Sequence, residues 1–193
     1  MTHVAETVVR MGELATSRIR DDVLAVIGLG SCIGLVLLDR THHVAGLAHV
    51  MLPSSQIGNK GDAPAKFADR AVKALADGLI PLGSRRSELV AVLIGGARMF
   101  ATVSVGSGLD IGARNEETIR EELKHAGIPI VAACTGGEKG RTARVLVESG
   151  RVLCKEAGGT EQELFAGRPV AHKAARAGTP LATIVEALEG GTS

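Results

Sequence analysis

Among the cysteines and histidines of this chain, Cys32 and His49 are the pair whose types and positions most favour covalent chemistry. Cysteine is a strong nucleophile as its thiolate, and a neighbouring imidazole can supply the base that removes the thiol proton. Cys32 follows directly after the glycine-rich segment 28–31, where a turn would present its side chain. A cysteine in an apolar run is also a common buried structural residue. The pair therefore predicts either nucleophilic catalysis by a cysteine or a structural thiol of the core.

Apolar segments around these two residues must form the elements that position them. We expect three strands joined by turns into a β-meander. They cover residues 23–27, 32–38 and 44–50. A tight hairpin between the second and third strands would be centred on Arg40 and Thr41. In that register Cys32 lies directly opposite His49, with Cβ atoms about 4.5 to 5.5 Å apart. A slip of two residues keeps both side chains on one face, whereas a slip of one separates them.

The glycines of this apolar run have a second interpretation, a phosphate-binding turn. Gly28, Gly30 and Gly34 do not have the G-x-G-x-x-G spacing of a dinucleotide-binding turn. The glycine-rich segments 95–100 and 135–141 lack the Gly-Lys-Ser/Thr order of a P-loop. We expect structural turns with close backbone approach, and nucleotide binding stays the alternative.

Apolar periodicity predicts further elements along the rest of the chain. The expected helices cover 64–79 and 115–127, the second capped by Asn115. The expected strands cover 88–94, 128–134, 143–148 and 151–156, the last two forming a hairpin. An edge strand is expected within 4–19, and a short amphipathic helix ends at Gly190.

The composition predicts one domain with a core of small aliphatic side chains. The chain has 193 residues, of which 45% are hydrophobic, with 25 glycines, three phenylalanines and neither tryptophan nor tyrosine. One core commonly serves a chain of this length. Nucleic-acid binding is not expected, because the net charge is +1 and aromatic residues do not cluster. The uncharged stretch 23–38 is shorter than the roughly 20 residues that span a bilayer, so we expect no membrane insertion.

The cysteines and histidines outside the pair indicate no metal site. Cys134 and Cys154 lie in apolar strands, where we expect inert core thiols. His42 and His43 have no third ligand at a recognisable spacing. Three cysteines without a C-x-x-C pattern favour a reducing compartment, and we expect the cytoplasm.

Five motifs together resemble a known protein family. They are GLGSC at 28–32, HVMLP at 49–53, GGARMF at 95–100, IGARN at 111–115 and TGG with GR within 135–141. In this order they resemble the chemoreceptor glutamine deamidase family, CheD. The resemblance implies an α/β fold of a mixed, α+β-like kind, in which packed β-sheets are flanked by helices. It implies a deamidase domain at 1–165 and leaves 166–193 as a C-terminal extension.

The resemblance also implies a reaction and its residues. Specific glutamine side chains of methyl-accepting chemotaxis receptors would be hydrolysed to glutamate without a cofactor. Cys32 would be the nucleophile and His49 the base. For the oxyanion of such a reaction, the backbone N–H groups of the turn Gly30, Ser31 and Cys32 are the expected donors. The family's third catalytic residue, a threonine six positions before the cysteine, is replaced here by Val26. The group that orients the imidazole is then absent, a backbone carbonyl, or a residue from elsewhere in the chain.

A partner-binding role is the alternative function. The family also binds a chemotaxis phosphatase of the CheC type, so loss of the threonine could leave a regulatory binding module with weak catalysis. Phe100, one of the three phenylalanines, is expected in a loop where it could contact such a partner.

Overall fold

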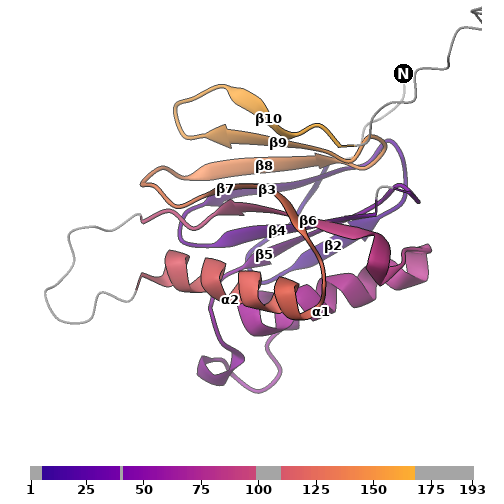
Figure 1. Ribbon diagram of the computed structural model, residues 1–193. Coiled ribbons are helices and arrows are strands. Elements are labelled where there is room, and N and C mark those ends of the chain that lie inside the picture. Colours follow the sequence, from indigo (N-terminus) through magenta and orange to yellow (C-terminus); the bar gives the residue numbers. More distant parts are fainter. Residues whose placement is uncertain (1–5, 40, 99–109, 168–193) are drawn as a thin grey trace, which may run out of the picture.

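The protein consists of two five-stranded β-sheets packed on one another, with two helices on the outer face of one sheet (Figure 1). The computed structural model describes residues 6–39, 41–98 and 110–167. The first sheet, here the β3 sheet, has the strand order β1-β3-β8-β9-β10, and the second, the β4 sheet, has the order β2-β5-β4-β6-β7. Within the described residues this is a single mixed α/β domain, as expected. Phe100 and nearly all of the predicted C-terminal extension lie outside the described residues.

The strands of the β3 sheet are β1 (Glu6–Val8), β3 (Val23–Leu29), β8 (Arg141–Leu146), β9 (Arg151–Glu156) and β10 (Glu161–Phe165). Those of the β4 sheet are β2 (Leu14–Ser17), β4 (Ile33–Asp39), β5 (Val44–Val50), β6 (Leu89–Gly95) and β7 (Ile130–Thr135). The helices are α1 (Ala68–Leu79) and α2 (Ile111–His125), and short 3₁₀ turns cover Ser55–Ile57, Pro64–Lys66, Ile80–Leu82 and Arg86–Glu88.

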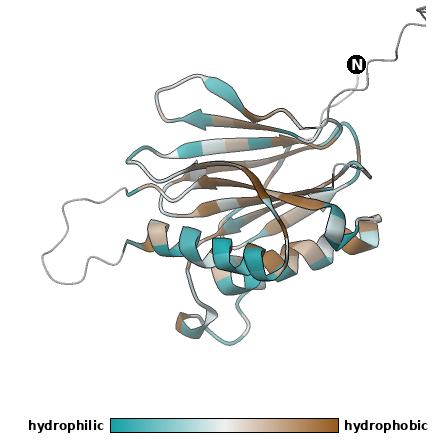
Figure 2. Cartoon of the chain, in the orientation of Figure 1, coloured by the Kyte–Doolittle hydropathy of each residue, from teal (hydrophilic) through white to brown (hydrophobic). Residues whose placement is uncertain are grey.

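The β4 sheet has two buried faces because it lies between the helices and the β3 sheet. Along β4, Ile33, Leu35 and Leu37 pack toward the helices, and Val36 and Leu38 pack toward the β3 sheet. Hydrophobic residues accordingly dominate these inner strands, while the outward side of α2 is largely hydrophilic (Figure 2). Successive side chains of a strand alternate between faces, so a residue's position along β4 or β5 decides which core it enters.

The expected β-meander is wrong at its first turn. β3 pairs with β1 and β8, whereas β4 pairs with β5 and β6, so the glycine turn between β3 and β4 crosses from one sheet to the other. Glycines between two apolar strands allow either connection, and both strands are apolar enough for burial on two faces. Cys32 therefore lies where the chain crosses between the two sheets, and not in the turn of a β3–β4 hairpin.

The β4–β5 hairpin exists, but its register differs from the expected one by two residues. Asp39 pairs with Val44, and Gly34 pairs with His49. The connection is longer than a two-residue turn, because the Asp39 carboxylate accepts hydrogen bonds from the backbone N–H groups of Thr41 and His42, at 2.9 and 3.0 Å. Burial alone would raise the pKa of Asp39, but these bonds and one from Ser84 lower it to about 2. Cys32 is thus diagonal to His49 instead of opposite.

Other expected elements are confirmed with shifted boundaries. The helix expected from Asn115 begins at Ile111, and Asp110 is its N-cap, accepting a hydrogen bond from the N–H of Ala113 at 3.0 Å. The strand expected in the core, β7, carries half-buried and exposed side chains at the edge of its sheet. The β8–β9 hairpin is confirmed. The strand β10 was not expected from the polar composition of its segment.

Candidate functional site

The turn that carries Cys32 is held by backbone hydrogen bonds from the loop after β6. The N–H of Ala97 donates to the carbonyl of Gly30 at 2.7 Å, and the N–H of Gly96 donates to the carbonyl of Cys32 at 2.8 Å. The carbonyls of the turn are thereby directed toward this loop. Residues 30–32 thus form a hydrogen-bonded platform between β3 and β4.

Gly95 is the point of closest backbone approach in this platform. Its φ is +112°, and a Cβ built on it would lie 2.3 Å from the carbonyl oxygen of Cys32. The loop after β7 supports it, because the N–H of Gly136 donates to the Gly95 carbonyl at 2.9 Å. The first glycine-rich segment therefore serves close backbone packing, as expected. In the second, a Cβ at Gly136 would meet no atom within 4 Å, and its φ of +74° is that of a turn.

His49 lies on the same face of the β4 sheet as Cys32. It belongs to β5 and pairs with Gly34, and the alternation of side chains directs it toward the β3 sheet. Cys32, half-buried, packs against that same inter-sheet cluster. Because Gly34 has no side chain, nothing from β4 covers the imidazole at the paired position. The shared face that the sequence predicted is confirmed, although the pair is not directly opposed.

The hydrogen bond of the His49 ring defines its tautomer. Nδ1 lies 3.4 Å from the carbonyl oxygen of Val9, and a carbonyl only accepts, so Nδ1 carries the proton. Nε2 is consequently unprotonated, and it is buried without a hydrogen-bond partner among the residues that the structure describes. No hydrogen bond joins Nε2 to Cys32 in this structure. The imidazole is therefore a neutral acceptor available to a proton.

Val26 faces, from the opposite sheet, the residue of β4 that pairs with His49. It is fully buried in β3, and its Cγ1 lies 3.3 Å from where a Cβ of Gly34 would be, across the inter-sheet space from the residue paired with His49. Its apolar side chain offers the ring no hydrogen bond. Of the three alternatives left by the sequence, the structure has the backbone carbonyl, that of Val9, whose own N–H is anchored to the Ala25 carbonyl at 2.8 Å.

Burial shifts both titratable groups toward their neutral forms. It raises the pKa of the Cys32 thiol above its ordinary value. It lowers the pKa of His49, although the Val9 hydrogen bond acts in the opposite direction. A pre-formed thiolate and imidazolium pair is therefore disfavoured, and the resting site holds a neutral thiol and a neutral base.

Asn115 is a site residue that sequence reasoning missed, because it was taken for a helix cap. It is completely buried on α2. Its side-chain Nδ2 donates to the carbonyl of Ser31 at 3.1 Å and to that of Met51 at 2.9 Å. Its place in the IGARN motif was the only feature of the sequence that could have indicated a role at the site.

Arg141 is a second missed residue, and it joins the two sheets beside the platform. Its guanidinium donates to the carbonyl of Gly136 at 2.6 Å and to that of Gly95 at 3.3 Å, and it pairs with Glu156 at 2.8 Å. The side chain is almost fully buried. It holds both glycine loops in place.

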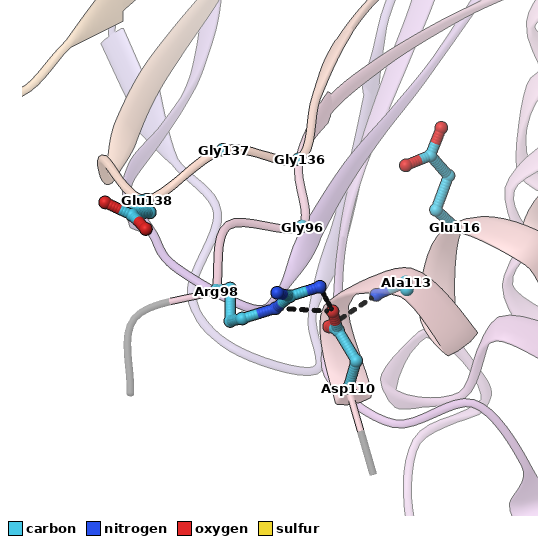
Figure 3. A pocket seen from close by; sticks show the side chains of 8 residues that line it. All are labelled: Gly96, Arg98, Asp110, Ala113, Glu116, Gly136, Gly137 and Glu138. Carbon is cyan, nitrogen blue, oxygen red and sulfur yellow. Dashed lines mark hydrogen bonds and ion pairs between the residues drawn. The ribbon is translucent and has the colours of Figure 1, made fainter. Parts of the chain in front are cut away.

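A cavity of about 320 Å³ lies between the glycine loops and the beginning of α2 (Figure 3). Gly96, Gly136 and Gly137 line one wall, and Asp110 and Glu116 of the α2 region line another. The guanidinium of Arg98 pairs with Asp110 at 2.9 Å across its mouth. Neither Cys32 nor His49 lines this cavity, so it lies beside the glycine loops without containing the candidate pair.

The remaining cysteines lie in the core between the sheets. Cys154 is buried. Its pKa is raised to about 12, mainly by burial and to a smaller extent by the neighbouring Cys134. Such a thiol is a poor nucleophile at neutral pH. Among the described residues no cluster of three or more histidine, cysteine or acidic side chains is placed to hold a metal ion. None of the described helices is both long and apolar enough to cross a membrane.

Comparison with known proteins identifies relatives of this chain. The sequence pattern of the family described as CheD chemotactic sensory transduction matches residues 51–156. "Probable chemoreceptor glutamine deamidase CheD" of Symbiobacterium thermophilum is 43% identical over 157 residues, 81% of this chain and 95% of the relative. "Chemoreceptor glutamine deamidase CheD" of Thermotoga maritima is 40% identical over 155 residues, 80% of this chain and 94% of the relative. A "Probable chemoreceptor glutamine deamidase CheD" of Archaeoglobus fulgidus is 42% identical over 157 residues, 81% and 97% of the two chains. With relatives matched over almost their whole length, the chain belongs to the CheD family.

Proposed function

We propose that this protein hydrolyses glutamine side-chain amides of chemoreceptors to glutamate, with Cys32 as the nucleophile and His49 as the general base. The names of the relatives support the substrate and the reaction. The observation that carries the assignment of residues is the unpartnered Nε2 of His49 on the face that Cys32 also occupies. The receptors are cytoplasmic partners in this proposal, and no cofactor takes part.

The neutral resting state sets the order of proton transfers. As Sγ of Cys32 attacks the carboxamide carbon, Nε2 of His49 takes the thiol proton. The imidazolium then gives that proton to the departing nitrogen, and ammonia leaves from the tetrahedral intermediate. Water, deprotonated by the same imidazole, attacks the thioester and releases glutamate and the free thiol. The Val9 carbonyl keeps the ring in the required tautomer throughout.

Backbone N–H groups of the turn are the proposed oxyanion donors. The carbonyls of Gly30 and Cys32 are occupied by the loop after β6. The N–H groups of Gly30, Ser31 and Cys32 donate to no acceptor within the described part of the chain. Donors held in place and free of partners can stabilise developing negative charge at no reorganisation cost, and each such donor can change kcat by about 10² to 10³.

The test of this function uses the cytoplasmic fragment of a chemoreceptor. Mass spectrometry of the fragment, before and after incubation with the protein, should show specific glutamines converted to glutamate and ammonia released. A receptor panel in which no glutamine is converted contradicts the proposal. Capture of a CheC-type phosphatase by the same inactive protein would instead support the regulatory binding module.

The pH dependence should show a neutral pair. Burial lowers the His49 pKa, so the base loses its proton at a lower pH than usual. A plot of kcat/KM against pH should therefore rise with a midpoint below about pH 6.5. Because burial raises the Cys32 pKa, alkylation of this thiol by iodoacetamide should climb with a midpoint above about 8.5. Cys32→Ala, measured in parallel, gives the background from the other cysteines. Fast alkylation that is already maximal near pH 5 to 6 would show an ion pair and contradict the neutral state.

Restoring the family's threonine should bring no gain. In Val26→Thr the ring of His49 already has its acceptor in the Val9 carbonyl, so kcat should stay unchanged. The buried hydroxyl should lower the free energy of unfolding by about 1 to 3 kcal/mol. Val36→Thr, in the same inter-sheet core, is the matched control for that cost. A rise in kcat of about tenfold, equivalent to about 1.4 kcal/mol of new stabilisation, would show that His49 lacks an orienting group.

A further inference from the structure

We propose that Asn115 is a positioning residue that fixes the Ser31–Cys32 peptide plane, so that the Cys32 N–H is aimed at the reacting carbonyl oxygen. The inference rests on the proposed function. It assigns to a helix residue, remote in sequence from the turn, the task of holding an oxyanion donor.

The side chain of Asn115 is committed to the turn by its chemistry. Both of its acceptors, the carbonyls of Ser31 and Met51, require a donor, so the NH₂ group faces them and Oδ1 faces away. Oδ1 is then buried without a partner among the residues that the structure describes. Burial of an unpaired acceptor is unfavourable, so packing alone does not explain an amide at this fully buried position. The two donated bonds are its evident contribution.

The geometry of a peptide unit converts this bond into control of an N–H. The peptide bonds of the described residues contain no cis unit, and in a planar trans peptide the C=O and N–H point in opposite directions. With the Ser31 carbonyl held toward α2, the N–H of Cys32 must point away from α2. The bond from Ala97 to the Gly30 carbonyl acts in the same way on the N–H of Ser31. Asn115 therefore locks the second of two consecutive donors.

The second bond of Asn115 relates the turn to the strand of the base. Met51 follows directly after β5 and lies two residues beyond His49. The same NH₂ group thus joins the turn of the nucleophile to the end of the strand that carries the imidazole. α2 is anchored beside Asn115 by Ile119, one helical turn further along, which is fully buried in the core. A peptide flip at Ser31–Cys32 would have to break a bond anchored in a packed helix.

Two assays separate positioning of the oxyanion donor from a general structural role. Hydrolysis of the amide passes through an oxyanion, whereas alkylation of Cys32 by iodoacetamide does not. In Asn115→Leu, which removes both bonds and keeps the branched shape of the side chain, kcat for receptor glutamine should fall by about 10²-fold, the scale of one oxyanion donor, with KM unchanged. The alkylation rate should stay that of the wild type. Asn115→Ala, which also removes both bonds and adds no volume at this buried position, should show the same split if the leucine variant does not fold.

Leu123→Ala is the matched control on the same helix. It removes buried contacts of α2 without touching the turn, so it should lower the melting temperature and leave kcat unchanged. Equal activity of the Asn115 variants and the wild type overturns the inference while the proposed function stands. A parallel loss of alkylation and kcat also overturns it, in favour of a structural role. Wild-type protein that converts no glutamine overturns the proposed function, and the inference falls with it.

Discussion

Replacement of Cys32 by alanine is expected to abolish the conversion of receptor glutamine, with a loss of kcat/KM of at least about 10⁴-fold. Cys154 is not expected to substitute, because it is buried with its pKa raised to about 12. The fold should persist, since Cys32 is half-buried at a turn whose geometry is set by backbone hydrogen bonds. Mass spectrometry of the receptor fragment measures the loss, and circular dichroism checks the fold.

Cys134→Ala is the matched control for this result. Cys134 is also partly buried against the inter-sheet cluster, but its thiol is outside the platform. This variant should deamidate at the wild-type rate. Conversion that survives in Cys32→Ala, or that disappears in Cys134→Ala, would contradict the assignment of the nucleophile. If Cys32→Ala still captures a CheC-type phosphatase, binding and catalysis are separable properties of the chain.

Gly95→Ala is expected to damage both stability and catalysis. The alanine would have to adopt a φ of +112°, and its Cβ would lie 2.3 Å from the carbonyl oxygen of Cys32, a backbone atom that cannot rotate away. The turn must shift, which breaks the hydrogen bond from Gly96 to Cys32 and misplaces the proposed oxyanion donors. We expect the free energy of unfolding to fall by more than the roughly 1 to 3 kcal/mol of backbone strain alone, and kcat by about 10²-fold or more.

Gly83→Ala separates these two effects. Gly83 also has a positive φ, +97°, but a Cβ there meets no atom within 4 Å. It should therefore show the strain alone, as a lower melting temperature with unchanged kcat. Thermal unfolding and receptor deamidation of the two variants give the comparison. A Gly95→Ala protein as active as Gly83→Ala would show that close contact at Gly95 does not set the geometry of the turn.

Strand positions and the common face of the reactive pair were predictable from the sequence. Continuous apolar runs located β4 and β5, and the prediction that Cys32 and His49 share a face held despite a register error of two residues. The register error arose because the Asp39 side chain stabilises a connection longer than the two-residue turn. The residue types of the turn do not indicate this interaction.

The partition of strands between sheets was not predictable. β3 and β4 are both apolar and joined by a glycine turn, which suits a hairpin as well as a crossing between sheets. The group that orients His49 was not predictable either. It is the backbone carbonyl of Val9, which every residue type would provide. Asn115 was misread for a related reason, since its burial arises when α2 docks on the sheet.

The central claim is a thioester formed between Cys32 and a receptor glutamine, and interception of that thioester tests it most directly. Hydroxylamine added to the deamidation reaction should compete with water for the acyl group, so that mass spectrometry finds glutamyl hydroxamate at the same positions that otherwise become glutamate. This holds even when the thioester does not accumulate. The account predicts hydroxamate with the wild-type protein and with Cys134→Ala, and none with Cys32→Ala. Glutamate as the sole product in the presence of hydroxylamine, or hydroxamate formed by Cys32→Ala, would contradict it.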